Sequence, residues 1–298
     1  MGGIVGTERN LSYFKPVQSD LALLGELWRL HPRYQGCIGH WLLGEGGGIT
    51  AYDISGYNTN GTLTNMDPST DWVPGLHGMV VNFDGTNDYI NGGNSSLFNF
   101  NQSNSTLSIS AWVRVISFAG NSKCIFSRWG VGQRQYSIDF SSTGAFEFIT
   151  STDGNAVAMR VATTATFLTD QWYHTVATAD IGRDIYNLYI DGIELPTTGG
   201  TTLTTLFNST ANVIIGATKD GTDDLFNGDI GDVRVYNRIL SNTEISSLYL
   251  EPFLEFTDVL GERILAQILV VAGLFPPWHL RQELPRSEVI KVPIIHYT

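Results

Sequence analysis

The chain has 298 residues and a formal net charge of −12; 42% of its residues are hydrophobic and only 15% are charged. A chain of this length can bury a substantial core, and its abundant Gly, Ser, Thr and Asn suit strands and turns better than helices. The acidic balance repels phosphate backbones and the sequence contains no Lys/Arg cluster. Nucleic acid is therefore not an expected partner.

Residues 1–36 are expected to form an N-terminal arm with a short helix. Ser19 or Asp20 is a candidate N-cap and Pro32 is expected to end the helix. The apolar positions between them share helical spacing: Leu23, Leu24, Leu27 and Leu30. The first residues show no basic region followed by an apolar one, so no secretory signal peptide is predicted.

Residues 37–250 alternate short β-type runs with Gly, Asn, Asp and Ser clusters, as in "LSISAWVRVIS", "QWYHTVATA" and "NVIIGAT". This pattern is typical of an antiparallel sandwich or jelly roll. Asp191 and Gly192 predict a tight hairpin turn, and Ser241 with Glu244 predicts a capped helix start. Four tryptophans lie in strand-like runs and are expected to fill the gap between two sheets: Trp41, Trp72, Trp112 and Trp172.

Residues 251–298 are expected to form a C-terminal apolar arm. Its longest apolar run, "ILAQILVVAGLF", is shorter than the roughly 20 residues that a membrane helix needs, so no membrane span is predicted. The two arms are expected to dock on the sandwich or on a neighbouring chain. Cys37 and Cys124 either pair with each other or are two buried thiols.

The order of several segments resembles a known family. "IGHWLLGEGGGITAYDISGYNTNGTLT", "WVPGLHGMVVNFDGTNDYINGG", "LSISAWVRV", "LYIDGIEL" and "FNGDIGDVRVYNRILSNTEISSLY" follow one another as in laminin-G-like, concanavalin A-like jelly-roll domains. The resemblance covers roughly residues 37–250. It implies an all-β fold of two curved antiparallel sheets packed face to face.

A structural calcium ion is one expectation. The segment "YDISGYNTNG" carries Asp53, Asn58 and Asn60 in turns whose oxygen atoms can converge on a hard cation. The resemblance implies that a last-strand acidic residue completes such a site. Asp232 matches the second acidic position of that strand, but Gly231 stands at the first. The alternative is that Asp53 only caps an Asx-turn.

The motif "FDGTNDYI" is interpreted as a structural turn, in which Asp84, Gly85 and Asp88 hold the loop through backbone hydrogen bonds. Catalysis is not expected. Glycosidases on this type of sandwich typically carry Glu-x-Asp-x-Glu on one strand, and the chain has no such run. It also lacks the HExxH, GxSxG and P-loop motifs.

The segment "CIFSRWGVGQRQYS" supplies the candidate ligand-binding residues, Arg128, Trp129, Arg134 and Tyr136. Aromatic and guanidinium groups at a sandwich rim can stack on a sugar or grip a partner. The alternative is a hairpin with a buried Trp129.

Two functions are carried forward. The first is a non-enzymatic virion structural protein, a decoration, fibre or adhesion subunit of a bacteriophage-type particle. Its terminal arms would anchor it to neighbouring subunits in a homo-oligomer or larger assembly. The second is a carbohydrate-binding lectin or adhesion module, stabilised by calcium if the predicted site is filled. Both place the protein on a virion or an extracellular surface.

Overall fold

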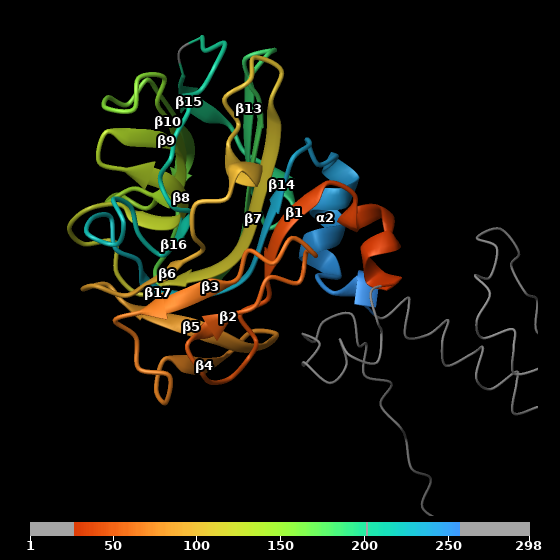
Figure 1. Ribbon diagram of the computed structural model, residues 1–298, viewed down its shortest axis with the longest axis vertical. Coiled ribbons are helices and arrows are strands. Elements are labelled where there is room, and N and C mark those ends of the chain that lie inside the picture. Colours follow the sequence, from red (N-terminus) through yellow and green to blue (C-terminus); the bar gives the residue numbers. More distant parts are fainter. Residues whose placement is uncertain (1–26, 201, 257–298) are drawn as a thin grey trace, which may run out of the picture.

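The computed structural model describes residues 27–200 and 202–256, which form two antiparallel sheets packed face to face (Figure 1). The predicted all-β jelly-roll sandwich is confirmed. Sheet A has eight strands, in the spatial order β14 (Ile193–Glu194), β13 (Ile185–Ile190), β12 (Trp172–Asp180), β7 (Thr106–Val115), β17 (Asn227–Tyr236), β5 (Gly78–Asp84) and β4 (Trp72–Gly75), with β1 (Cys37–Trp41) paired to β17. Sheet B has nine, in the order β15 (Thr197–Gly199), β11 (Met159–Thr166), β10 (Ala145–Thr150), β9 (Gln133–Phe140), β8 (Lys123–Gly130), β16 (Ile214–Ile215), β6 (Tyr89–Asn91), β3 (Gly61–Thr64) and β2 (Thr50–Ala51).

Strand β17 joins the parts of sheet A. One edge of β17 pairs with β7, and the other pairs first with β5, over residues 227–230, and then with β1, over residues 233–236. The β7 ladder is interrupted by a bulge between Gly231 and Arg234. Gly228 passes so close to β7 that a Cβ atom there would lie 2.0 Å from the carbonyl oxygen of Arg114. Only glycine fits this approach.

The core between the sheets follows from strand alternation. In β7, Ile109, Ala111 and Val113 point into the core, and in β9 Tyr136 and Ile138 do the same. Trp41 and Trp72 also lie in this core, as predicted. Trp112 and Trp172 do not. Trp112 lies on the opposite face of sheet A, because its strand position alternates with those of the core residues, and it stacks on Tyr249.

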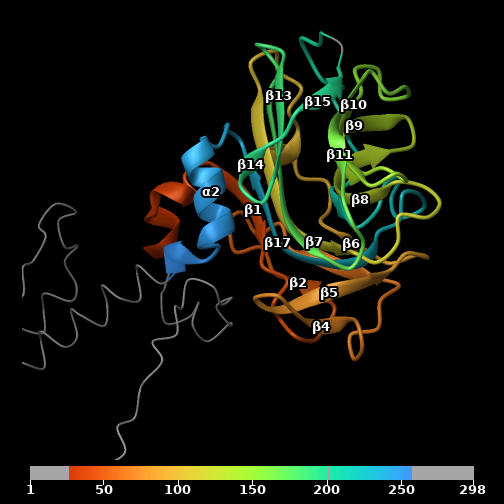
Figure 2. The same ribbon diagram turned by 180° about the vertical axis from the view of Figure 1, so that it is seen from behind.

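The outer face of sheet A is covered by the helix α2 (Asn242–Leu250) and by the 3₁₀ turns η2 (Leu27–Leu30) and η3 (Pro32–Tyr34) (Figure 2). A further 3₁₀ turn, η4 (Ser96–Phe98), lies between β6 and β7. Ser241 caps α2, and Glu244 returns a hydrogen bond to the Ser241 backbone. This capping box was predicted. Beneath α2 lies a second apolar cluster, which includes Tyr34, Leu248, Phe253 and Phe256.

The described ends of the two predicted arms belong to that second cluster. The predicted boundaries at residues 36 and 250 both fall inside it, because Tyr34 and Phe253 are buried there. The described helical turn η2 ends at Leu30, ahead of Pro32 as predicted, and Pro32 itself opens η3, where its missing N–H is harmless. The rest of the predicted arms, residues 1–26 and 257–298, lies outside the described residues.

Other local predictions are settled by the same structure. Cys37 and Cys124 are free and buried. Asp191 and Gly192 have φ angles of 53° and 80°, which a type I′ hairpin turn requires. In the described part of the chain, no helix combines the length and the apolar character needed to cross a bilayer.

Candidate functional site

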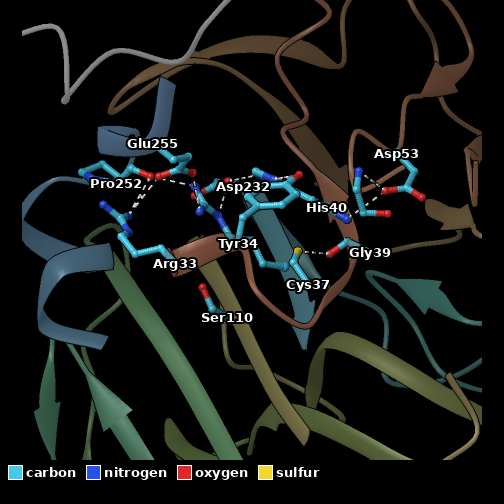
Figure 3. Close-up of polar contacts among 12 residues, drawn as sticks. Arg33, Tyr34, Cys37, Gly39, His40, Asp53, Ser110, Asp232, Pro252 and Glu255 are labelled. Atoms are coloured by element: carbon cyan, nitrogen blue, oxygen red, sulfur yellow. Dashed lines mark hydrogen bonds and ion pairs between the residues drawn. The ribbon is translucent and has the colours of Figure 1, made fainter. Parts of the chain in front are cut away.

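The carboxylate of Asp53, the first predicted calcium ligand, accepts hydrogen bonds from other residues of the protein (Figure 3). Its carboxylate accepts hydrogen bonds from the backbone N–H groups of His40 (3.0 Å), Ser55 (2.8 Å) and Thr59 (2.9 Å), and from the Thr59 hydroxyl (2.7 Å). Burial raises the pKa of Asp53, but these hydrogen bonds outweigh burial and hold the pKa below its ordinary value. The bond from Ser55 forms an Asx-turn, and the carboxylate fixes the 53–59 loop.

Asp232 lies on the other side of His40 (Figure 3). It stands at the β17 bulge with a φ of 51°, and its Oδ1 contacts His40 Nε2 at 2.7 Å and accepts from Arg234 Nε at 3.1 Å. Burial raises the pKa of Asp232, but the Arg234 charge and the His40 contact bring it well below its usual range.

These residues do not fit a calcium ion in this arrangement. The oxygens of Asp53 already accept several donors, and Asp232 is in contact with a guanidinium that repels a second cation. Asn60 Oδ1 accepts from the Asp53 backbone N–H at 2.9 Å, and Asn58 serves the turn with a φ of 57°. Within residues 27–200 and 202–256, no cluster of three or more His, Cys, Asp or Glu side chains is arranged to hold a metal.

The polar network continues from Asp232 to the segments that precede β1 and follow α2 (Figure 3). Arg234 donates to Glu255 Oε1 and to the Pro252 carbonyl, both at 2.6 Å. Arg33 donates to the Glu251 carbonyl at 2.8 Å and lies 3.4 Å from Glu255 Oε2. The network therefore ties the segments before β1 and after α2 to the centre of sheet A.

The predicted turn residues lie between β5 and β6. Asp84 Oδ1 accepts from the Thr86 N–H at 2.7 Å, and Asp88 Oδ2 accepts from the Asp84 N–H at 3.0 Å. Gly85 has a φ of 75°, and a Cβ there would meet Asn227 at 2.6 Å. Burial, more than neighbouring charge, raises the pKa of Asp88 to about 6.

Two of the predicted ligand-binding residues do not reach the surface. The β8–β9 register pairs Arg128 with Tyr136 and Trp129 with Arg134, and a bulge separates the two pairs. The first pair points inward: Arg128 is 1% exposed and donates to the Ser95 carbonyl at 2.7 Å, and Tyr136 is fully buried. Arg128 and Tyr136 are thus structural, which corrects the prediction for both.

Trp129 and Arg134 lie on the outer face of sheet B, where the Arg134 guanidinium stacks over the indole ring at 5.5 Å. They line a cavity of about 170 Å³, which we call the sheet B cavity. Its other lining residues come from β8 to β11 and from the loop before β17: Ser122, Ser137, Asp139, Ile149, Val157, Arg160, Lys219 and Asp224. The alternative prediction, that Trp129 is buried, also holds, because only 6% of the residue is exposed.

Two polar atoms on this lining have no nitrogen or oxygen hydrogen-bond partner. Asp139 is 1% exposed; its Oδ2 accepts from the Ser137 hydroxyl at 2.9 Å, its Oδ1 meets no such donor, and the buried Cys124 thiol, a weak donor, interacts with the carboxyl group. Arg134 donates from one terminal nitrogen to the Asn155 carbonyl, while its buried Nε is unpartnered. Burial, with the nearby charge of Asp224, raises the pKa of Asp139 to about 7. Buried polar atoms without partners are rare and call for an explanation.

Sequence reasoning missed most of this lining. The run "RQYSIDF" did hold a signal, because Ser137 and Asp139 alternate with core residues. That alternation places two polar side chains on the outer face of one strand. Lys219 and Asp224 gave no such signal, since they reach the cavity from a loop that is distant in sequence.

Comparison with solved structures finds the same fold in proteins of low sequence identity. The binding domain of Paraclostridial Mosquitocidal Protein 1 superimposes with a TM-score of 0.58 and 17% identity, over 72% of this chain and 52% of that one. A mutant of Trypanosoma rangeli sialidase displaying trans-sialidase activity gives a TM-score of 0.55 and 15% identity, over 80% and 38%. This chain thus spans about half or less of those two proteins.

A third structure is matched over nearly its whole length. Domain 4 of AbnA, a GH43 extracellular arabinanase from Geobacillus stearothermophilus, solved in complex with arabinotriose, gives a TM-score of 0.54 and 20% identity, over 72% of this chain and 98% of that one. A search of curated protein sequences finds no match. The family model described as "Concanavalin A-like lectin/glucanases superfamily" matches residues 84–246, more than half of the chain. The sandwich, its register and this match agree: the chain belongs to the concanavalin A-like lectin/glucanase superfamily.

Proposed function

We propose that the protein is a carbohydrate-binding module that holds a sugar in the sheet B cavity. One observation carries this proposal: the indole of Trp129, with the Arg134 guanidinium over it, lines the cavity together with hydrogen-bonding side chains of both kinds, the donors Arg160 and Lys219 and the carboxyl groups of Asp139 and Asp224. A sugar hydroxyl both donates and accepts, so adjacent hydroxyls of one ring complement these groups. An apolar sugar face suits an aromatic wall.

Two of the structurally similar proteins are in keeping with a binding role. One is the binding domain of Paraclostridial Mosquitocidal Protein 1, and another was solved with arabinotriose. Their identities of 17% and 20% support the fold, and the sugar preference of this chain is a separate question.

We favour binding over hydrolysis. Hydrolysis needs two carboxyl groups roughly 5 to 9 Å apart that flank the bond to be cleaved. Here Asp139 is almost fully enclosed, and Glu147, its partner across the β9–β10 ladder, lies 3.1 Å from Arg160. Mass spectrometry of the sugar after long incubation with the protein tests this, and shortened products would refute a purely binding role.

The test of binding is a glycan array followed by calorimetry with Arg134→Gln and Asp139→Asn. Both variants remove one of the unpartnered atoms or its charge without leaving a large void. We expect each to weaken binding at least tenfold. Arg183→Gln, a change at an exposed arginine in the turn between β12 and β13, is the matched control. Undiminished binding by both cavity variants, or no glycan bound by the wild type, would overturn the proposal.

A second role is compatible with the first: a subunit anchored to a larger assembly, such as the virion protein considered above. The observation that favours it is the placement of the ends of the described segment. The turn η2 and the residues that follow α2 lie on the outer side of sheet A, whereas the residues of the sheet B cavity belong to the sheet on the opposite side of the sandwich (Figures 1 and 2). An anchor on one side leaves the sugar site free on the other. Light scattering of the full chain tests this role, and a monomer at all concentrations would count against it.

A further inference from the structure

A second and larger cavity, of about 320 Å³, adjoins the sheet B cavity, and we call it the loop cavity. It is bounded by residues 119–121 of the β7–β8 connection, by Lys123 at the start of β8, by residues 222–225 and by Gly85. Asp224 lines both cavities. Ser122 lines the sheet B cavity, while its chain neighbours on both sides line the loop cavity. The cavities are therefore neighbours, divided by a wall that contains Asp224 and Ser122.

This wall is held in place from several directions. The Asp224 carbonyl accepts from the Cys124 backbone N–H at 2.9 Å, which ties the wall to β8. The Asp224 carboxylate accepts from the Thr218 hydroxyl at 2.9 Å. Asn121 donates to Asp223 at 2.8 Å and so joins the two loops that border the loop cavity. A wall fixed in this way needs little ordering when a ligand binds.

The two cavities carry charges of both signs. Four cations, Lys123, Arg134, Arg160 and Lys219, and three carboxyl groups, Asp139, Asp223 and Asp224, line them. Arg160 is paired with Glu147 and Lys219 with Asp223. Lys123 donates to the backbone carbonyls of Ala119 and Asn121 at 2.9 and 3.0 Å. The chain as a whole carries a net charge of −12, which repels anions at long range. These features suit an uncharged ligand rich in hydroxyl groups.

We propose that the two cavities are adjacent subsites for one neutral linear oligosaccharide, whose glycosidic linkage crosses the wall at Asp224. This inference rests on the proposed function, because the sheet B cavity is one of the two subsites. It goes further in naming the ligand as a chain of at least two uncharged sugar units. The carboxylate of Asp224 accepts a hydrogen bond from a hydroxyl group of one of the two sugar units, next to the linkage.

The test is a length series measured by calorimetry and by NMR amide shifts on the full chain. The probes are mono-, di- and trisaccharides of the arabino, xylo, cello and malto series, with the uronic-acid trisaccharide of polygalacturonate as the anionic comparison. For the series that binds, we expect affinity to rise on the order of tenfold or more from one to two units. Amide shifts are expected at residues 119–123 only with two or more units.

The blocking variant is Ala119→Trp, which fills the loop cavity from an exposed position. It is expected to reduce disaccharide affinity to that of the monosaccharide and to leave the monosaccharide affinity unchanged. The matched control is Ser103→Trp, an exposed position that precedes β7 and lines neither cavity.

The outcomes separate the two claims. Binding that depends on Arg134 but not on ligand length or on Ala119→Trp would overturn the two-subsite inference and leave the proposed function standing. Tighter binding of the uronic acid than of every neutral sugar would overturn the neutral-ligand assignment. No binding in any series would overturn the proposed function, and the inference with it.

Discussion

The Asp139→Asn variant provides a stringent test of the sheet B cavity, because its effect on stability follows from the site. Burial, together with the Asp224 charge, raises the pKa of Asp139 to about 7, against an ordinary aspartate pKa of about 3.9 when the chain is unfolded. The folded protein therefore binds more protons than the unfolded chain between about pH 4 and 7, and stability falls as pH rises through that window. A pKa difference of about three units corresponds to a loss of folding stability on the order of 4 kcal/mol above pH 7.

Asparagine has nearly the same shape and no charge, so Asp139→Asn removes this loss. We expect the variant to be more stable than the wild type by on the order of 4 kcal/mol at pH 8, and by only about 1 kcal/mol at pH 4.5. Urea unfolding at several pH values between 4.5 and 8.5 measures the difference. Equal stability at pH 8, or a difference that does not change with pH, would refute the burial argument. The same variant is expected to bind sugar poorly, which separates stability from function.

Four further outcomes are expected elsewhere in the molecule. Asp53→Asn replaces a carboxylate whose pKa is lowered by its hydrogen bonds, and should reduce the free energy of unfolding by about 1–3 kcal/mol at pH 7. Urea unfolding should show this reduction shrinking as the pH falls below about 4. Glu255→Gln removes one of the carboxylates that face the buried Arg234; we expect a loss of about 3–5 kcal/mol and faster limited proteolysis near residues 251–256. Gly85→Ala forces a Cβ against Asn227 at a φ of 75°, and should lower the free energy of unfolding by about 1–3 kcal/mol in the same urea assay. Added calcium or a chelator should leave the thermal midpoint unchanged, and a calcium-dependent rise would restore the predicted metal site.

Much of the fold was readable from the sequence because its signals are local. The I′ turn at Asp191 needs only two residues, and the capping box of α2 needs Ser241 and Glu244. The alternation of apolar and polar residues predicted where the strands lie. Trp112 was misplaced because alternation does not say which face of a strand the next layer covers, and α2 supplies a second buried face.

The candidate site was harder to predict because it depends on register and on distant loops. A single bulge in the β8–β9 ladder, at Gln135, brings Arg134 beside Trp129 on the outer face of sheet B, whereas simple alternation would place Arg134 on the same face as Tyr136. Asp232 was correctly linked to the loop of Asp53, but through His40 rather than through a metal ion. Asp224 joins the site through a hydrogen bond to β8, about a hundred residues away in sequence, which no local pattern records.

The central position of β17 has a consequence for how the chain folds during synthesis. Strands β1, β5 and β7 all take β17 as a neighbour, and β17 ends at Tyr236. While the ribosome is still making the chain, one long edge of β7 has no partner, and β1 and the β4–β5 hairpin are not yet attached to the rest of sheet A. Pairings of such sequence separation form slowly, and unpaired strand edges invite aggregation. We therefore expect sheet A to be completed only after β17 is made, and the nascent chain to be most vulnerable to aggregation just before that point.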